Sequence, residues 1–300
     1  MKTYDQLHID VPEDNLTILG LARKLAANVT RPPVPTDPSL RETWAAEERT
    51  KLGDVIRYSP VSVESAWPVS NTNHNQVESI SYRFEFGNGL SATGVWMKEA
   101  STEADAPLTI VLNDGGTEAA ANEEWDLVKE VGDRLARGQQ VLAVNLVFFG
   151  DAAPDITAAQ FTQMLAAEGE RPLGLETAQL VSLAGWAKAQ WSPQQLRVET
   201  TGPRTQVITL AAATLQPHLF SQVETWDGMD SFSYLLDKPV NYLPAEPTLS
   251  SGAADAAAPD LFCLDLYKDF DIDRLVLMAN PTQVVQQHYL QAPSGIEAIR

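Results

Sequence analysis

The stretch RVETTGPRTQVITLAAATL, residues 197–215, decides the fold class of this chain. Residues 196–202 are typical of a short strand, which ends in a tight turn at Gly202. Residues 206–215 are rich in alanine and predict a helix. Near-continuous apolar strands separated by helices are typical of a parallel sheet that helices cover on both faces.

The alternation of strands and helices continues on both sides of this stretch. We expect further strands at residues 108–113, 141–149, 220–226 and 282–290, and helices that end near Gly138 and cover residues 174–189. Earlier in the chain, residues 79–86 and 90–97 alternate apolar and polar side chains around a Gly87-Asn88-Gly89 hairpin turn. The sequence therefore predicts an α/β fold, a three-layer sandwich around a mostly parallel sheet with an N-terminal antiparallel hairpin.

The first part of the chain has a different character. Residues 15–29 and 38–53 have helical patterns, and the proline-rich segment between them ends the first helix. We expect residues 1–53 to form a helical lead-in and residues 54–300 to form one compact α/β domain. The low-complexity residues 250–258 are expected to form a loop or a linker.

The charge balance restricts the classes of partner. The chain has 300 residues, with 21 Lys and Arg against 40 Asp and Glu, so its formal net charge is −19. Nucleic acids and anionic membranes need a basic patch, so we expect neither as a partner. The single cysteine, Cys263, excludes an internal disulfide. Residues 1–14 lack the apolar region of a signal peptide, so we expect a soluble chain whose compartment stays open.

The order of elements resembles the α/β-hydrolase fold over about residues 60–290. Within it the chain is most similar to the acetyl-xylan-esterase-like branch, and there to the second, nucleophile-lacking domain of two-domain bacterial members. Four segments carry the resemblance, and they are VLNDGG (111–116), RPLGLETAQL (171–180), residues 197–215 and PDLFCLDLYKDFDIDRL (259–275). The resemblance implies that the first is the oxyanion loop, the second the helix before the nucleophile elbow, and the third the elbow itself.

The elbow lacks the serine that the resemblance implies. Such hydrolases keep their nucleophile in G-x-S-x-G, whereas this chain reads Gly202-Pro203-Arg204-Thr205-Gln206. A guanidinium stays protonated and cannot act as a nucleophile. Thr205 is the nearest hydroxyl but is displaced by one position, so we favour a role for it at the start of the helix over a catalytic one.

A histidine base and its acid are also in doubt. The family places the histidine after an eighth strand. Between Leu290 and Arg300 we expect no further strand, and the segment contains no histidine. We expect structural or solvated roles for its four histidines, with His288 the strongest catalytic candidate among His8, His74, His218 and His288. Asp227 and Asp230 follow the strand at 220–226, where some α/β hydrolases carry their acid, although both also suit a tight turn.

Two further features bear on ligands. Asp114, Gly115 and Gly116 could form an oxyanion or anion-binding loop, although paired glycines after a strand are common without function. Arg204 could pair with Asp227 or Asp230, or clamp a ligand carboxylate. Metal and nucleotide motifs are missing from the sequence, so we expect no metal and no cofactor.

These observations favour a catalytically degenerate domain that serves as the structural or binding partner of a catalytic esterase domain. Trp44 and the prolines at 32–38 are candidate docking features, and a homo-oligomer is a further option. The alternative is an active carboxylester hydrolase, of the acetyl xylan esterase type, with a non-standard or shared site. A second alternative is a carbohydrate-binding module that binds polysaccharide through exposed tryptophans.

Overall fold

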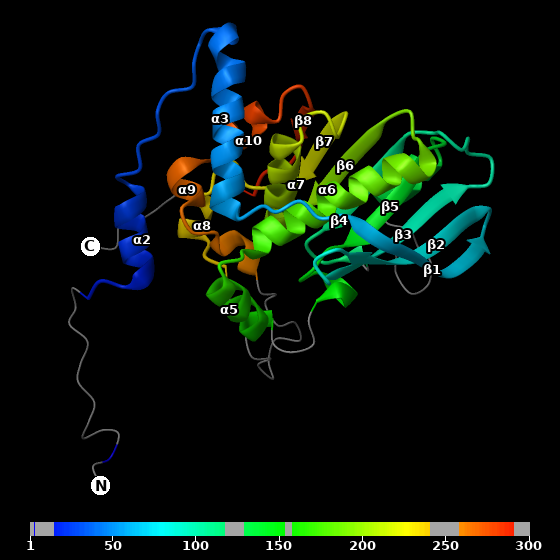
Figure 1. Ribbon diagram of the computed structural model, residues 1–300, viewed down its shortest axis with the longest axis horizontal. Coiled ribbons are helices and arrows are strands. Elements are labelled where there is room, and N and C mark those ends of the chain that lie inside the picture. Colours follow the sequence, from blue (N-terminus) through cyan, green and yellow to red (C-terminus); the bar gives the residue numbers. More distant parts are fainter. Residues whose placement is uncertain (1–2, 4–14, 118–128, 154–157, 241–257, 291–300) are drawn as a thin grey trace.

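The computed structural model describes residues 3, 15–117, 129–153, 158–240 and 258–290 (Figure 1). At its centre is one eight-stranded sheet of order β1-β2-β3-β5-β4-β6-β7-β8. The strands are β1 (Val63–His74), β2 (Val77–Phe86), β3 (Ser91–Glu99), β4 (Leu108–Asn113), β5 (Gln140–Asn145), β6 (Leu196–Thr201), β7 (Gln222–Trp226) and β8 (Gln283–Gln286). The pairs β1–β2, β2–β3 and β3–β5 are antiparallel. The pairs β5–β4, β4–β6, β6–β7 and β7–β8 are parallel. The prediction of a mixed, mostly parallel sheet is confirmed.

Strand β1 is the element that the sequence analysis missed at this end of the sheet. It is an edge strand whose residues are mostly exposed, so they lack the apolar alternation that marks β2 and β3. Its register on β2 is irregular between Pro68 and Ser70, and proline on an edge strand is tolerated because one side needs no donor. The predicted hairpin of β2 and β3 is confirmed, with Gly89 at a φ of 78° in its turn.

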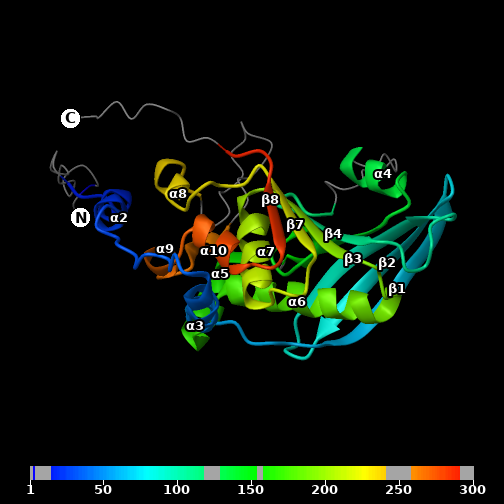
Figure 2. The same cartoon turned by 90° about the horizontal axis from the view of Figure 1, so that it is seen from above.

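Helices form one thick layer on one face of the sheet (Figure 2). This layer contains α3 (Pro38–Ile56), α6 (Pro172–Trp191), α7 (Pro203–Leu215) and α10 (Ile272–Met278), with α7 in contact with the other three. On the opposite face lies α4 (Lys129–Leu135), which packs against β3 and β5. Helix α2 (Ile18–Ala26) and the short α8 (Tyr234–Asp237) and α9 (Leu266–Asp269) lie beyond the sheet's β8 side.

The core lies between the sheet and the layer around α7. Residues 204–214 of α7 are all buried, and the alanine and threonine side chains among them allow the helix to pack closely. At the other end of α6, an aromatic cluster includes Trp96 stacked on Trp191 with ring centroids 5.2 Å apart. Trp44 also packs against the core, whereas Trp67 is 47% exposed. Most of these tryptophans are therefore structural.

Several boundaries and one helix differ from the predictions, and β8 spans only Gln283–Gln286 of the expected 282–290. β5 ends at Asn145 because the chain turns there, with Phe148 at a φ of 71°. Helix α5 (Ala158–Glu168) was not predicted, although its Phe161 and Leu165 have helical spacing and pack against Phe148. Residues 250–257 and most of the helix expected before Gly138 lie outside the described residues. In the part of the chain that is described, no helix has the length and apolar character needed to cross a bilayer.

Candidate functional site

The elbow is a strand–turn–helix junction between β6 and α7, as the sequence predicts. Gly202 lies there at a φ of 108°, and Pro203 begins the helix. The Asp114 carboxyl group, from the loop after β4, lies directly over this glycine. A Cβ atom on Gly202 would come within 2.3 Å of Asp114 Cγ. The junction therefore needs glycine both for its backbone conformation and for the space.

Asp114 caps the first turn of α7 from outside the helix. Its Oδ2 accepts the backbone N–H of Arg204 at 3.0 Å, and its Oδ1 accepts the backbone N–H and the hydroxyl of Thr205, each at 2.9 Å. A carboxylate is favoured at a helix N-terminus because the free N–H groups point toward it. Burial nevertheless raises the pKa of Asp114 to about 6, against the lowering effect of these hydrogen bonds.

The two glycines that follow Asp114 do not point their N–H groups toward the elbow. The Gly115 N–H donates to Asn113 Oδ1 and the Gly116 N–H donates to the Asn113 carbonyl, both at 2.8 Å. The loop after β4 therefore satisfies its own donors. What it presents to the elbow is the Asp114 carboxyl group.

Arg204 is buried, with 6% of its surface exposed. Its Nε and Nη2 atoms both lie 2.8 Å from Asp260 Oδ1, in the short helix η3 (Pro259–Phe262). Nη2 lies 3.9 Å from Glu176 Oε1 on α6, and the guanidinium stacks 4.0 Å from the centre of the Phe149 ring. The partners of Arg204 are therefore Asp260 and Glu176, and the predicted pairing with Asp227 or Asp230 is wrong.

Three carboxyl groups surround this one guanidinium. Glu176 is fully buried, and neither of its oxygens has a hydrogen-bond partner in the part of the chain that the structure describes. Burial raises the pKa of Glu176 well above its ordinary value, and the charge of Asp260 raises it further. The raised pKa disfavours the charged form of Glu176, and Asp260, whose Oδ1 lies 2.8 Å from Arg204 Nη2, is the nearer counter-ion of Arg204.

This arrangement predicts that the protein loses stability as the pH rises. A carboxyl group whose pKa is raised in the folded state binds more protons there than in the unfolded chain. Asp114 contributes this loss between about pH 4 and pH 6, and Glu176 extends it to higher pH. We compare the free energy of unfolding of Glu176→Gln with that of the wild type, measured by urea denaturation. As the pH rises from 5 to 8, we expect the difference to shift in favour of the variant by at least about 1 kcal/mol.

Glu85→Gln is the matched control, because Glu85 is exposed on β2. It removes one charge from the surface and therefore reports the general effect of net charge. Stability curves of Glu176→Gln and wild type that stay parallel across this pH range would contradict the prediction.

Thr205 and Gln206 are both fully buried. The Thr205 hydroxyl lies 2.9 Å from Asp114 Oδ1 and 3.1 Å from the Thr201 carbonyl, so its contacts are those of a residue at a helix start. The Gln206 amide donates to the Met229 carbonyl at 2.9 Å and accepts the Met229 N–H at 2.7 Å. At the position of the motif's second glycine, this side chain therefore anchors the loop after β7.

The structure brings two of the predicted candidates together. His288 Nδ1 lies 2.5 Å from Asp227 Oδ1, and both side chains are well exposed. They follow the parallel strands β8 and β7, whose ends are also joined by a hydrogen bond from the Gly228 N–H to the His288 carbonyl. Asp230, His74 and His218 are exposed, and His8 lies outside the described residues.

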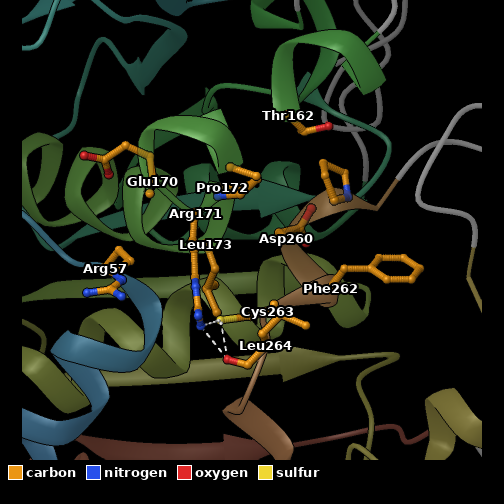
Figure 3. Close-up of a pocket in the computed structure, with 13 residues that line it drawn as sticks. Arg57, Thr162, Glu170, Arg171, Pro172, Leu173, Asp260, Phe262, Cys263 and Leu264 are labelled. Carbon is orange, nitrogen blue, oxygen red and sulfur yellow. Dashed lines mark hydrogen bonds between the residues drawn. The ribbon is translucent and has the colours of Figure 1, made fainter. Parts of the chain in front are cut away.

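A cavity of about 280 Å³ lies beside the elbow, between α5, the start of α6 and η3 (Figure 3). Asp260 lines it and also binds Arg204, so the cavity and the buried cluster share one wall. Arg171 fixes another wall by donating to the carbonyls of Val55 and Leu264. Within the described ranges, no group of three or more His, Cys, Asp or Glu is placed to hold a metal ion.

Comparisons with known proteins show which solved structures share this fold. No model of a protein family matches the sequence, and no curated protein matches it. Solved structures do match, among them a proposed acetyl xylan esterase from Bacteroides fragilis with a TM-score of 0.70, 14% identity, and coverage of 93% of this chain and 78% of that one. This chain has an α/β-hydrolase fold. A glucuronoyl esterase from Solibacter usitatus has a TM-score of 0.54 at 10% identity, with 87% and 81% covered.

The α/β-hydrolase fold gives the elbow geometry its meaning. In this fold the nucleophile stands at the strand-to-helix turn, and the N–H of the next residue helps to bind the oxyanion. Arg204 stands at that turn here, and the next N–H, that of Thr205, binds the Asp114 carboxyl group. The sequence shows that position 204 is not a serine, but it could not show that the Asp114 carboxyl group binds the Thr205 N–H.

Proposed function

We propose that this chain is a catalytically inactive α/β-hydrolase-fold domain that acts as a structural or binding partner of an esterase. The observation that carries the proposal is the buried elbow, in which Arg204 is paired with Asp260 and Glu176. A nucleophile at this turn must reach the substrate, whereas Arg204 points into the protein and has no nucleophilic lone pair.

The surroundings of Arg204 support the same proposal. Oxyanion donors stabilise a developing negative charge, and they must be free to do so. The Thr205 N–H already binds Asp114, whose own negative charge would repel an oxyanion at that place. The Gly115 and Gly116 N–H groups are engaged with Asn113.

A second candidate function rests on the contact between Asp227 and His288. A histidine oriented by a carboxylate can act as a general base. This pair is exposed at the carboxyl ends of β7 and β8, where ligands bind in open α/β sheets. In this alternative the chain would be a carboxylester hydrolase that uses a non-standard site.

Hydrolysis of p-nitrophenyl acetate distinguishes the two candidates. We expect the purified chain to hydrolyse this activated ester no faster than its His218→Ala variant, because His218 is another exposed histidine with background imidazole reactivity. We expect His288→Ala to behave in the same way. Saturable turnover that His288→Ala abolishes and His218→Ala leaves intact would establish the alternative, and saturable turnover kept by both variants would also overturn inactivity.

A further inference from the structure

Strands β6 and β7 carry polar side chains on the sheet face opposite α7. Leu196, Val198 and Val223 point into the core and are buried. The residues between them, which include Arg197, Glu199, Gln222 and Glu224, lie on the other face. Parallel strands that helices cover on both faces are normally apolar on both. This face of β6 and β7 is therefore not built to pack against an apolar helix.

The polar residues line a groove of about 400 Å³, which we call the β6–β7 groove. The groove lies on the face of the sheet that carries α4, the upper face in Figure 2. Its walls include Arg134, Arg197, Glu199, Glu224, Trp226 and Gln287. The volume lies within the range of small-molecule sites. The groove is on the far side of the sheet from Arg204 and its partners, so it is separate from the elbow.

An ion-pair network fixes the floor of the groove. Arg134 contacts Glu199 and also lies 3.5 Å from Glu224 Oε2, and its side chain is only 12% exposed. Glu224 Oε1 accepts the Gln287 side-chain amide at 2.9 Å. These planar groups are held in place before any ligand arrives, which reduces the entropy lost on binding.

Two donors that line the groove lack an acceptor. Arg197 Nε and the Trp226 indole N–H have no hydrogen-bond partner among the described residues, although Arg197 Nη2 donates to Gln195 at 2.6 Å. Buried donors without partners are costly, and they are normally satisfied by protein, water or ligand. Both atoms are buried in the unliganded chain, so an acceptor reaches them only when the Arg197 and Trp226 side chains turn toward the groove, and the partners that satisfy them are water, hydroxyl or ether oxygens.

We propose that the β6–β7 groove binds a neutral polyhydroxylated molecule, such as a mono- or disaccharide. Neighbouring hydroxyl groups accept from Arg197 and donate to Glu224, and the indole of Trp226 adds an apolar ring edge with one donor. Three arginines in the lining balance three acidic residues, so the groove itself has no strong charge preference; they are Arg134, Arg137, Arg197, Asp133, Glu199 and Glu224. The net charge of −19 on the whole chain disfavours anions. Ligand binding at this site does not depend on whether the elbow is catalytically inactive.

The proposal is tested by titrating the full chain with glucose, maltose and cellobiose, and with gluconate as an anionic probe. Tryptophan fluorescence and saturation-transfer NMR detect the weak affinities expected for sugars. We expect saturable binding of at least one neutral sugar, and a loss of about tenfold in affinity in Arg197→Gln and in Glu224→Gln. Arg83→Gln is the matched control, because it removes an exposed arginine from β2.

Trp226→Phe provides a test that does not alter the ion pairs. It keeps an aromatic ring and removes the indole N–H, so we expect weaker binding with an unchanged melting temperature. Absence of saturable binding to all three sugars would overturn the proposal. Binding of gluconate alone, or sugar binding that Arg197→Gln, Glu224→Gln and Trp226→Phe all leave unchanged, would overturn it as well.

Discussion

Arg204→Ala is expected to lower the free energy of unfolding by about 3–5 kcal/mol, measured by urea denaturation at neutral pH. The substitution removes the guanidinium that lies 2.8 Å from Asp260 Oδ1 and leaves that buried carboxylate without a cation. It also removes the group stacked on the Phe149 ring, which adds lost packing to the electrostatic cost.

Two further variants separate the charge effect from the packing effect. The double variant Arg204→Met with Asp260→Asn removes both charges and is expected to recover part of the loss, because a buried ion pair can be replaced by uncharged groups. Arg83→Ala, at an exposed pair with Glu85, should change stability by no more than about 0.5 kcal/mol. If Arg204→Ala were as stable as Arg83→Ala, the buried cluster described above would not exist in solution.

Gly202→Ala is expected to be the second most damaging change, at about 2–4 kcal/mol. The new Cβ atom would lie 2.3 Å from Asp114 Cγ, and alanine would have to adopt a φ of 108°. Relief of this clash requires the Asp114 carboxyl group to leave the Arg204 and Thr205 N–H groups. We therefore expect the start of α7 to lose its amide protection in hydrogen exchange.

Gly138→Ala is the control for backbone strain alone. Gly138 also has a positive φ, of 69°, but a Cβ atom there would meet nothing within 4 Å. Its cost is expected to be about 1 kcal/mol. Equal losses in Gly138→Ala and Gly202→Ala would mean that the contact with Asp114 does not contribute.

The main-chain architecture of this elbow could be predicted because its signals are local. Gly202, Pro203 and the alanine-rich residues after them are neighbours in the chain, and they give a turn followed by a helix. The predicted hairpin has a similar local basis at Gly89. Strand β1 could not be found in this way, because an exposed edge strand needs no apolar alternation.

The partners of Arg204 could not be predicted because they come from distant parts of the chain. Asp260 lies in η3 and Glu176 within α6, and nothing in either local pattern distinguishes a buried carboxyl group from a solvated one. The Asp227–His288 contact lies between these two cases. Each residue could be singled out as a candidate, and the carboxyl ends of neighbouring parallel strands bring them together.

The groove and the elbow carry two separate proposals, one about ligand binding and one about catalysis. At the elbow, the charged groups pair with one another inside the protein. The β6–β7 groove keeps charge at the surface of the sheet, where it can contact a ligand. A chain that binds sugars without hydrolysing esters would satisfy both proposals, and each experiment can fail without the other.

The carboxyl groups around Arg204 also dictate the order in which substitutions could accumulate at this elbow. A serine introduced first at position 204 would leave Asp260 without its cation and pass through a poorly stable intermediate. Neutral residues at positions 260 and 114, introduced beforehand, would remove that barrier and also free the Thr205 N–H. A change from this sequence to one with a serine at position 204 therefore has a required order of steps, in which the acids change before the arginine does.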